Sequence, residues 1–467
     1  MARAEIGLIG LGTMGAALAS NIAEKGFPIA VWNRTTEVTR SFHANSGALA
    51  ENIVPTESLE ELVKAIKSPR AIILMVPAGK AVDDQIAALS PLLDQDDLVI
   101  DAGNANFHDT NRRAAAGLPM HFLGMGVSGG EEGARHGPSI MGGGDRADWD
   151  RVSHILTAIS AKTDDGTACA TWMGQAGAGH FVKTVHNGIE YADMQMIAEI
   201  YGIMRDGLGH TAAEVAETFA QWNKGPLQSY LVEISAAVAG AADPITGKPM
   251  LDVILDAAGQ KGTGRWTAIE AQHLAAPVPV IEAAVMARNV SSRIGERQLG
   301  EAAYGPAPKP LTEGMATADL EQALIAGKIL CYAQGFTMIS AASESFGWDL
   351  PLPEIARVWR AGCIIRSSML NEMATALSED AGRNLILAPD FVARVKAGVP
   401  ALRRVVAAGA LNGLACPALA AGLSWFDMFT TARGTANMIQ GQRDFFGAHG
   451  FDRLDGADSH HGPWGAN

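Results

Sequence analysis

The sequence has few of the residues that mark disulfide-rich, metal-binding or nucleic-acid-binding proteins. Only four of its 467 residues are cysteine, Cys169, Cys331, Cys363 and Cys416, and they form no C-x-x-C pair. This usage is typical of small core residues in a reducing compartment. The formal net charge is −14, and no basic stripe offsets it, which argues against a nucleic-acid partner.

Long apolar runs and a targeting segment are also lacking. We find no uninterrupted apolar run of the ~18 residues that a membrane span requires. The chain enters the strand-like segment AEIGLIG almost at once, without the charged, apolar and small-residue succession of a signal peptide. We therefore expect a cytoplasmic protein with no membrane partner.

Apolar residues and glycine are plentiful, at 48% and 52 residues. A chain of this length exceeds one hydrophobic core, so two or three domains are expected. Five short apolar segments, AEIGLIG, PIAVWN, AIILMV, LVIDAG and HFLGMGV, alternate with helical stretches up to about residue 178. This alternation predicts a doubly wound parallel sheet. We predict an α/β domain over 1–178, an all-helical domain over 179–435 and a C-terminal tail over 436–467.

The first strand runs into a glycine turn, GLIGLGTMG, with Gly10, Gly12 and Gly15 at the start of a helix. The first glycine allows the tight turn, the second lets the backbone approach a pyrophosphate, and the third lets the helix pack on the strand. The helix N-terminus then offers free N–H groups to the phosphates. This pattern predicts a dinucleotide site, with a purely structural turn as the alternative.

The second strand ends in Asn33, Arg34 and Thr35, where an NAD-binding protein usually places an Asp or Glu on the ribose hydroxyls. A carboxylate would repel a 2′-phosphate, whereas Arg34 can pair with it and its neighbours can donate hydrogen bonds. We therefore predict NADP rather than NAD. The alternative is that Arg34 is an ordinary surface charge.

Two later segments also follow strands, DAGNAN (101–106) and GVSGGEEGARHGPSIMGGG (126–144). In an open parallel sheet ligands sit beyond the carboxyl ends of the strands, so we expect both segments to be loops at the cofactor crevice. Ser128, Gly129 and Gly130 form a small, donor-rich turn suited to a carboxylate. The alternative is a turn that only reverses the chain.

The stretch KTVHNGIEYADMQ places Lys183, His186, Asn187, Glu190 and Tyr191 at helical spacing on one face. Lys183 and Glu190 are seven residues apart, which is ~10 Å along a helix axis. That separation is too long for a comfortable ion pair but suits two groups that flank a short carbon chain. A solvated helix face is the alternative.

Cationic and hydroxyl side chains recur farther along the chain. DAAGQKGTGRWT carries Lys261, Thr263 and Arg265 among glycines, and Arg288 and Arg443 follow later. Such groups suit a phosphate. For Arg288 taken alone, an ordinary surface arginine is an equal alternative.

Together these segments resemble the 6-phosphogluconate dehydrogenase family. GLIGLGTMG, NRT, GVSGGEEGARHGPS, KTVHNGIEYADMQ, LDAAGQKGTGRWT, GCIIRS and QRDFFGAH occur in the family's order over nearly the whole chain. The resemblance implies a Rossmann-like domain, a large all-helical domain and a homodimer in which each C-terminal tail enters the partner subunit. It implies NADP-dependent oxidative decarboxylation of 6-phosphogluconate in the pentose phosphate pathway, without a metal.

The resemblance also implies roles for particular residues. Lys183 matches the family's general base and Glu190 its acid. The implied cofactor-binding residues are Gly10, Gly12, Thr13, Met14, Gly15, Asn33, Arg34, Thr35, Val76 and Asn104. The implied substrate-binding residues are Asn104, Ser128, Gly129, Gly130, His186, Asn187, Tyr191, Lys261, Thr263, Arg288, Arg443 and His449.

Some positions depart from the family pattern. Pro77 stands where the family usually has a lysine, with Lys80 slightly later, and the family's D-G-G-N-S reads DAGNA here. None of these departures removes a catalytic group. Two other functions stay open from the residues alone. One is a related dehydrogenase for a 3-hydroxy acid without phosphate, and the other is a catalytically silent NADP-binding protein.

Overall fold

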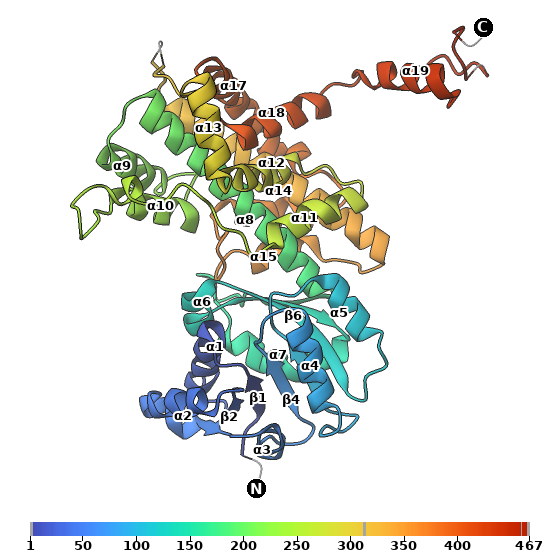
Figure 1. Cartoon of the computed structure of the whole chain (residues 1–467). Helices are drawn as coiled ribbons and strands as arrows, with labels where there is room; N and C mark the ends of the chain where they lie inside the picture. The colour runs from blue at the N-terminus through green and yellow to red at the C-terminus, as the bar shows by residue number, and fades with distance from the viewer. Residues whose placement is uncertain (1–2, 312–313, 459, 465–467) are drawn as a thin grey trace.

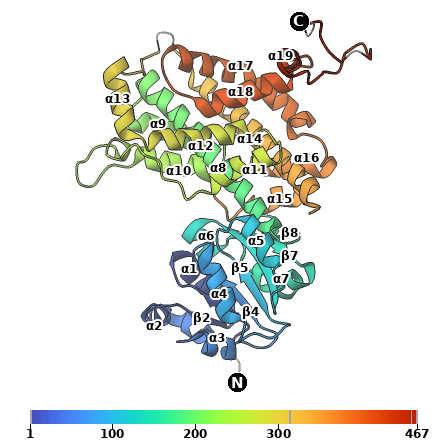
Figure 2. The ribbon, with the colours of Figure 1, turned by 45° about the vertical axis from the view of Figure 1, so that its right-hand side comes forward.

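The computed structural model describes residues 3–311, 314–458 and 460–464. A sheet domain holds the N-terminal part of the chain and a helical domain holds most of the rest, as Figures 1 and 2 show from two sides. Residues 459 and 465–467 of the predicted tail lie outside the described residues.

The described part of the first domain contains an eight-stranded sheet in the order β3-β2-β1-β4-β5-β6-β7-β8. All five predicted strands are present, and three more were not predicted. The strands are β1 (Ile6–Ile9), β2 (Ile29–Trp32), β3 (Ile53–Pro55), β4 (Ala71–Leu74), β5 (Leu98–Asp101), β6 (His121–Ser128), β7 (Ser139–Gly144) and β8 (Ala170–Gly174).

Two strands depart from the predicted parallel sheet, because β7 pairs antiparallel with β6 and β8 pairs parallel with β7. The segment 126–144 is therefore not a loop, as predicted, but the end of β6, a short helix α6 (Gly130–His136) and β7. The ten residues between β6 and β7 are too few for the crossover that a parallel pair needs. The return strand β7 therefore runs back beside β6, and Ser128 is the last residue of β6 before the turn.

Helices cover both faces of the sheet. Residues of α1 (Thr13–Glu24) and α7 (Arg146–Ile159) build the apolar core on one face, and those of α3 (Leu59–Ala65) and α4 (Lys80–Leu89) build it on the other. This is the doubly wound arrangement that the sequence predicts. The remaining elements of this domain are α2 (Thr36–Ala44), the 3-10 turn η1 (Gly47–Asn52) and α5 (Phe107–Ala114).

The helical domain is built around α8 (Ala178–Gly202), which continues into a π-helical turn at Ile203–Gly207. α8 packs against α11, α12, α14 and α18, and its first half also contacts β6 and β7. The helices of this domain are α9 (Ala212–Trp222), α10 (Tyr230–Gly240), α11 (Thr263–His273), α12 (Pro279–Ser291), α13 (Ile294–Tyr304), α14 (Thr317–Phe346), α15 (Leu352–Val358), α16 (Met369–Glu379), α17 (Pro389–Leu411) and α18 (Pro417–Phe429), with short 3-10 turns η3 (Met250–Asp252) and η4 (Leu385–Leu387).

α14 is the one helix among the described residues that is long and apolar enough to cross a membrane by length and composition. The sequence analysis found no such run. However, 89% of its most apolar window is buried inside the protein. It packs against α8, α17 and α18, so its apolar residues are accounted for by the core of the helical domain.

The tail begins with α19 (Ala436–Gly447), which Figure 1 shows extending away from the other helices. The sequence predicted a tail without a core, and no described residue of the tail belongs to a hydrophobic core cluster. Asp444 instead organises a cluster of hydrogen bonds. Its carboxylate accepts hydrogen bonds from Gly450 N at 2.9 Å, Gly462 N at 2.9 Å and Trp464 Nε1 at 3.0 Å. These bonds, together with His461, lower the pKa of Asp444 to about 2. The described residues after α19 are therefore held against this helix by hydrogen bonds to Asp444.

Candidate active site

The glycine turn leaves open the space that a pyrophosphate requires. Gly10 has a φ of +100°, and a Cβ there would lie 2.5 Å from the carbonyl oxygen of Met75. A Cβ at Gly15 would collide with the carbonyl oxygen of Gly10, so this position needs glycine for close packing. A Cβ at Gly12 would meet nothing within 4 Å. The start of α1 has no side-chain cap, so its N–H groups remain available for an anion.

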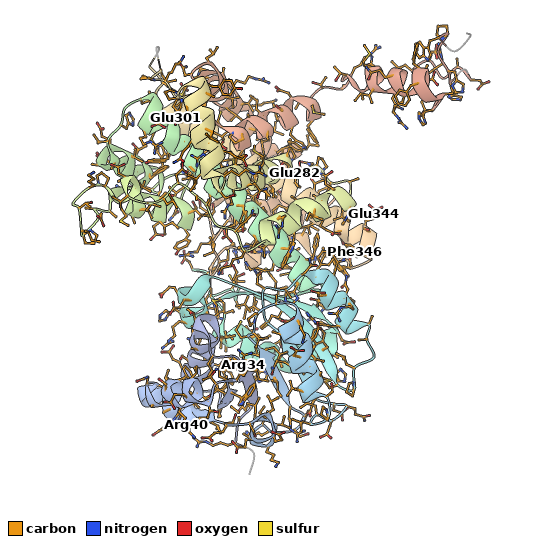
Figure 3. The ribbon with its side chains drawn as sticks, in the orientation of Figure 1. Arg34, Arg40, Glu282, Glu301, Glu344 and Phe346 are labelled. Atoms are coloured by element: carbon orange, nitrogen blue, oxygen red, sulfur yellow. The ribbon has the colours of Figure 1, made fainter. Side chains whose placement is uncertain are left out.

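Asn33 and Arg34, at the end of β2, have different surroundings. The Asn33 side chain accepts a hydrogen bond from Leu11 N at 3.1 Å and donates one to Thr35 O at 3.3 Å, so it braces the glycine turn. Arg34 is exposed and makes no ion pair or hydrogen bond with the described residues. Figure 3 labels Arg34 in the sheet domain. It is the available cation at this edge of the crevice.

Two further predicted cofactor residues lie at the ends of β4 and β5. Val76 follows β4, and its side chain lies 3.1 Å from where a Cβ on Gly10 would be. Asn104 follows β5 and is exposed. The structure thus places both beside the glycine turn and its neighbouring loop.

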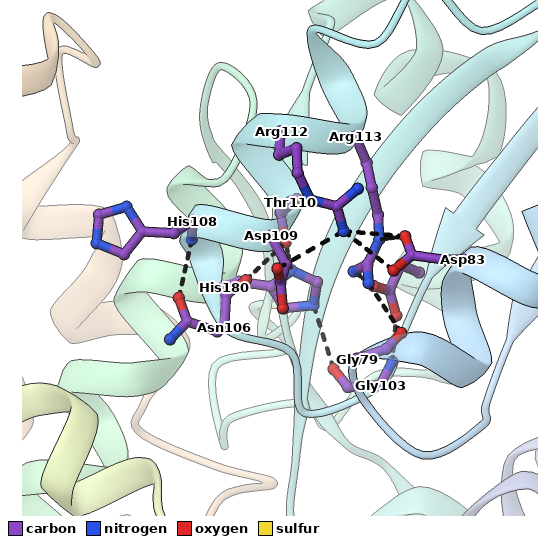
Figure 4. A network of polar contacts seen from close by, with 11 residues as sticks. Gly79, Asp83, Gly103, Asn106, His108, Asp109, Thr110, Arg112, Arg113 and His180 are labelled. Carbon is purple, nitrogen blue, oxygen red and sulfur yellow. Dashed lines mark hydrogen bonds and ion pairs between the residues drawn. The ribbon is translucent and has the colours of Figure 1, made fainter.

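A buried arginine that the sequence analysis did not single out joins these two loops. Arg113, on α5, donates to Asp83 at 2.8 Å, to Asp101 at 3.2 Å and to the carbonyl oxygen of Gly79 at 3.0 Å. Asp101 in turn accepts from Gly103 N at 3.1 Å. Figure 4 shows this network between α4 and α5. Arg113 is 2% exposed, its charge is matched by the buried Asp101 and the partly exposed Asp83, and its hydrogen bonds fix the loops after β4 and β5.

The polar edge of α8 is buried against the first domain, so the alternative of a solvated face is wrong. Lys183 is 7% exposed and His186 is fully buried. A Cβ on Gly126 of β6 would lie 2.5 Å from Lys183 Cβ, so the glycine allows the lysine stem to pack on the strand. Lys183 Nζ donates to Asn187 Oδ1 and lies 3.3 Å from His186 Nδ1.

His186 lies between the lysine and the glutamate. Its Nδ1 is 3.3 Å from Lys183 Nζ and 3.8 Å from Glu190 Oε2. Its Nε2 lies 3.3 Å from Ser128 Oγ. The amine and the carboxylate therefore both approach the same imidazole nitrogen, and no direct ion pair joins them among the described residues. That they flank a short carbon chain stays a prediction.

Burial shifts the acid–base properties of this pair in opposite directions. Burial lowers the pKa of Lys183, although the Glu190 carboxylate opposes the shift. Burial raises the pKa of Glu190, against the opposing effects of Lys183 and Arg288. Burial also lowers the pKa of His186 well below its ordinary value, which favours a neutral imidazole. Burial thus makes Lys183 easier to deprotonate and Glu190 easier to protonate than exposed groups, which are the directions that a base and an acid require.

The Ser128–Gly130 turn is held by the segment 359–363 of the helical domain. Gly129 has a φ of +116°, and a Cβ there would collide with the carbonyl oxygen of Gly362. Ser128 is 2% exposed. Gly130 has a φ of +64° and faces open space. The turn therefore has the backbone conformation and the free volume that a bound carboxylate would need.

Tyr191, Lys261, Thr263 and Arg288 meet near the N-terminus of α11. Gly262, with a φ of +103°, caps this helix without a side-chain hydrogen bond. Thr263 Oγ1 accepts from Asn187 Nδ2 at 2.9 Å, which connects α11 to the polar edge of α8. The Arg288 guanidinium lies over the Tyr191 ring at 3.6 Å, and Lys261 is exposed. A helix N-terminus with two cations beside it is a suitable phosphate site.

Two predicted residues lie apart from this cluster. Arg443 and His449 belong to α19 and the segment after it, and both are exposed. Arg443 donates to Gln440 on its own helix at 2.8 Å. The single chain does not bring them to α8.

The sequence analysis did not identify the contacts of Trp359 and Cys363 with this site. Trp359 is fully buried, and its ring lies 5.8 Å from that of His186. The Cys363 thiol donates to the Trp359 carbonyl oxygen at 3.1 Å, and burial raises its pKa to about 12. The motif GCIIRS contributed to the family resemblance, but no local pattern places it beside α8.

Comparison with known proteins agrees with this arrangement. Residues 5–174 match the model of the NAD binding domain of 6-phosphogluconate dehydrogenase, and residues 179–464 match that of its C-terminal domain. The chain belongs to the 6-phosphogluconate dehydrogenase family. Within this family, it is 46% identical to the decarboxylating 6-phosphogluconate dehydrogenase of Treponema pallidum, over 97% of this chain and 94% of that one.

Two further members of the 6-phosphogluconate dehydrogenase family cover the chain almost completely. The Bacillus subtilis enzyme named NADP(+)-dependent and decarboxylating is 46% identical, over 99% of this chain and 100% of the relative. A solved 6-phosphogluconate dehydrogenase of Plasmodium falciparum is 38% identical with a TM-score of 0.94, over 98% of this chain and 100% of that one. That structure's description names its apo form and complexes with NADP+ and 6-phosphogluconate.

Proposed function

We propose that this protein catalyses the NADP-dependent oxidative decarboxylation of 6-phospho-D-gluconate to D-ribulose 5-phosphate, CO2 and NADPH, a step of the pentose phosphate pathway. The observation that carries the proposal is the buried pair on α8. Burial shifts the pKa values of Lys183 and Glu190 in opposite directions. Lys183 packs on Gly126 of β6 and donates to Asn187, which donates in turn to Thr263 at the N-terminus of α11. Family membership and the activities named for the relatives support the same reaction.

The residues fit the cofactor that this reaction needs. The open space at Gly12 and the uncapped start of α1 would hold the pyrophosphate, and the exposed Arg34 would pair with a 2′-phosphate. Thr13 and Met14 begin α1 beside them, and Thr35, Val76 and Asn104 line the adjacent strand ends. When bound, NADP supplies the hydride acceptor.

Lys183 begins the reaction as a general base. Its neutral Nζ takes the proton from the 3-hydroxyl while hydride leaves C3. The 3-keto acid that results loses CO2, because the C1–C2 bonding electrons pass to the ketone oxygen. The ammonium form of Lys183 returns its proton to that oxygen. Glu190, whose pKa is raised by burial, then protonates the carbon that has lost CO2, while the neutral Lys183 takes back the proton of the enediol oxygen and so restores the ketone.

The remaining residues hold the substrate. Ser128, Gly129 and Gly130 would bind the carboxylate, and Asn104, His186 and Asn187 would bind the sugar hydroxyls. Tyr191, Lys261, Thr263 and Arg288 would bind the phosphate at the N-terminus of α11. The reaction requires no metal, since the ketone itself accepts the electrons.

The phosphate site is completed, in this proposal, by Arg443 and His449 of the partner subunit of a homodimer. Two observations support exchange of the tails. α19 extends away from its own chain (Figure 1), and it exposes apolar side chains that an isolated monomer would leave in water. These exposed side chains are Met438, Ile439, Phe445 and Phe446 on α19, and Leu454 in the segment after it adds another.

We also propose the domain division at 178/179 and 435/436 and a cytoplasmic location. The last strand ends at Gly174, α8 begins at Ala178, and α19 begins at Ala436. The location is supported by the cysteines, because all four lie within the described ranges as buried free thiols.

The test is steady-state reduction of NADP and of NAD, each with 6-phosphogluconate, while evolved CO2 is measured. We expect one CO2 for each NADPH and a preference for NADP. Gluconate, which lacks the phosphate, serves as the matched substrate control and should react poorly. Equal use of gluconate would favour a dehydrogenase for non-phosphorylated 3-hydroxy acids. Absence of NADPH formation under all buffers would favour a catalytically silent protein.

A further inference from the structure

A cluster of three potential metal ligands joins the two domains outside the residues assigned to catalysis. Glu270 Oε2 lies 2.8 Å from Nε2 of His108, on α5, and 3.2 Å from Nδ1 of His273, one turn farther along α11. The three ligand atoms all lie within 4.8 Å of one another, and no other such group of three occurs among residues 3–311, 314–458 and 460–464. The Glu270 side chain is 5% exposed, whereas the imidazoles are 53% and 65% exposed.

The donor atoms and their spacing suit a divalent transition metal. Two imidazoles and one carboxylate form a donor set that zinc commonly uses, with an open fourth position for water. Zinc–ligand distances of ~2.0–2.1 Å place the ligands of a tetrahedron about 3.3–3.4 Å apart. The measured contacts of 2.8 and 3.2 Å therefore need to open by only a few tenths of an ångström. The exposed edges of both rings give an ion a route from solvent.

A hydrogen-bonded bridge without an ion is the simpler account, and the chain contains an example for comparison. His121 Nδ1 lies 2.8 Å from Asp148, a buried carboxylate, with a single imidazole at that site. Arg151 Nη1 donates to the same carboxylate at 3.3 Å, so one imidazole and one guanidinium, which is no metal ligand, satisfy it. At Glu270, His108 of the first domain and His273 of the helical domain approach the same carboxylate oxygen. A metal site requires several such ligands, whereas a simple hydrogen bond requires only one imidazole.

The position of the cluster gives an ion a structural consequence. α5 follows directly on the loop that carries Asn104, and α11 begins with Thr263 of the predicted phosphate site. Figure 4 shows the His108 ring pointing away from the Arg112 and Arg113 network. We propose that His108, Glu270 and His273 form a regulatory site for a divalent transition-metal ion, represented by zinc, which ties together the two walls of the crevice and slows turnover.

Binding is tested on the full chain after treatment with a chelator. Isothermal titration with zinc chloride should give a high-affinity site that His108→Gln and His273→Gln each weaken by at least about tenfold. The matched control, His121→Gln, removes an equally exposed histidine from a buried carboxylate and should leave the affinity unchanged. Cobalt(II) should give the visible absorption of a tetrahedral site in the wild type but not in the double variant. Wild-type zinc affinity in both single variants would overturn the proposal.

The regulatory effect rests on the proposed function and is measured separately. Zinc should slow NADPH formation reversibly in the wild type and much less in His108→Gln, and a chelator should restore the rate. Unchanged turnover at saturating zinc would overturn the regulatory role. Absence of any reaction with 6-phosphogluconate, while zinc still binds at the histidines, would instead refute the proposed function.

Discussion

The polar residues of α8 and those of α19 occupy opposite environments. Lys183 and Glu190 are largely buried. Burial lowers the pKa of the Lys183 amine and raises that of the Glu190 carboxyl, and both shifts favour the neutral form. Arg443 and His449 are exposed on a helix that leaves its own domain. In the proposed mechanism burial prepares α8 for proton transfer, and in the proposed homodimer exposure leaves α19 free to bind the substrate phosphate electrostatically. Substitutions on α8 should therefore change kcat, and those on α19 should change KM.

The largest expected effect is that of Lys183→Met. Without the amine, the 3-hydroxyl proton has no acceptor, so kcat should fall by about 10²–10⁴-fold. Binding of 6-phosphogluconate, measured by calorimetry, should remain detectable, because the predicted phosphate and carboxylate sites are intact. The control is Lys224→Met, which removes an exposed lysine between α9 and α10. Wild-type turnover in Lys183→Met would refute the base assignment.

Glu190→Gln should have the next largest effect, and on a later step. Loss of the acid should slow product formation by about 10²-fold, while the first hydride transfer stays close to the wild-type rate. Rapid mixing should therefore show a burst of NADPH followed by a slow steady state. If the burst itself slowed as much as the steady state, Glu190 would act in oxidation instead.

Arg34→Asp replaces an exposed cation of the first domain with a carboxylate. A carboxylate there would repel the 2′-phosphate, so KM for NADP should rise about tenfold to a hundredfold while KM for NAD changes little. The control is Arg40→Gln, which breaks an exposed ion pair with Glu57 nearby. Figure 3 labels both arginines. An unchanged NADP/NAD preference would remove Arg34 from the cofactor site.

Arg443→Ala should have the smallest effect. Loss of one exposed cation should raise KM for 6-phosphogluconate roughly threefold to tenfold and leave kcat unaltered. Arg433→Ala, just before α19, should change neither constant. An unaltered KM in Arg443→Ala would argue against tail exchange. It would also favour the alternative of a substrate without a phosphate.

The sequence predicted the features that depend on neighbouring residues. Each of these features is formed by one continuous stretch of sequence, so its pattern can be recognised. They are the five apolar strands, the glycine turn and the polar edge of α8. It missed β7, because SIMGGG is rich in glycine and lacks the alternation of a typical strand. A glycine is needed there at Gly142, where a Cβ would collide with the Trp149 ring.

The missed contacts of the site join distant parts of the chain. Arg113 links the loops after β4 and β5, and Trp359 approaches His186 from far along the sequence. No local pattern records such contacts. Burial is likewise not visible in a local pattern. The spacing placed Lys183 and Glu190 on one helix face but could not show that this face is largely buried.

The most direct test of the account is the pH dependence of kcat in the wild type and in Glu190→Gln, because the step assigned to Glu190 follows the loss of CO2 and limits kcat. Activity should rise with pH as Lys183 loses its proton, and fall at higher pH as the site loses the Glu190 proton. The wild type should therefore give a bell-shaped profile. Glu190→Gln should keep the rise but reach a plateau, because its amide has no proton to lose. A profile in Glu190→Gln that still fell at high pH would contradict the pairing of a neutral amine with a protonated carboxyl on α8.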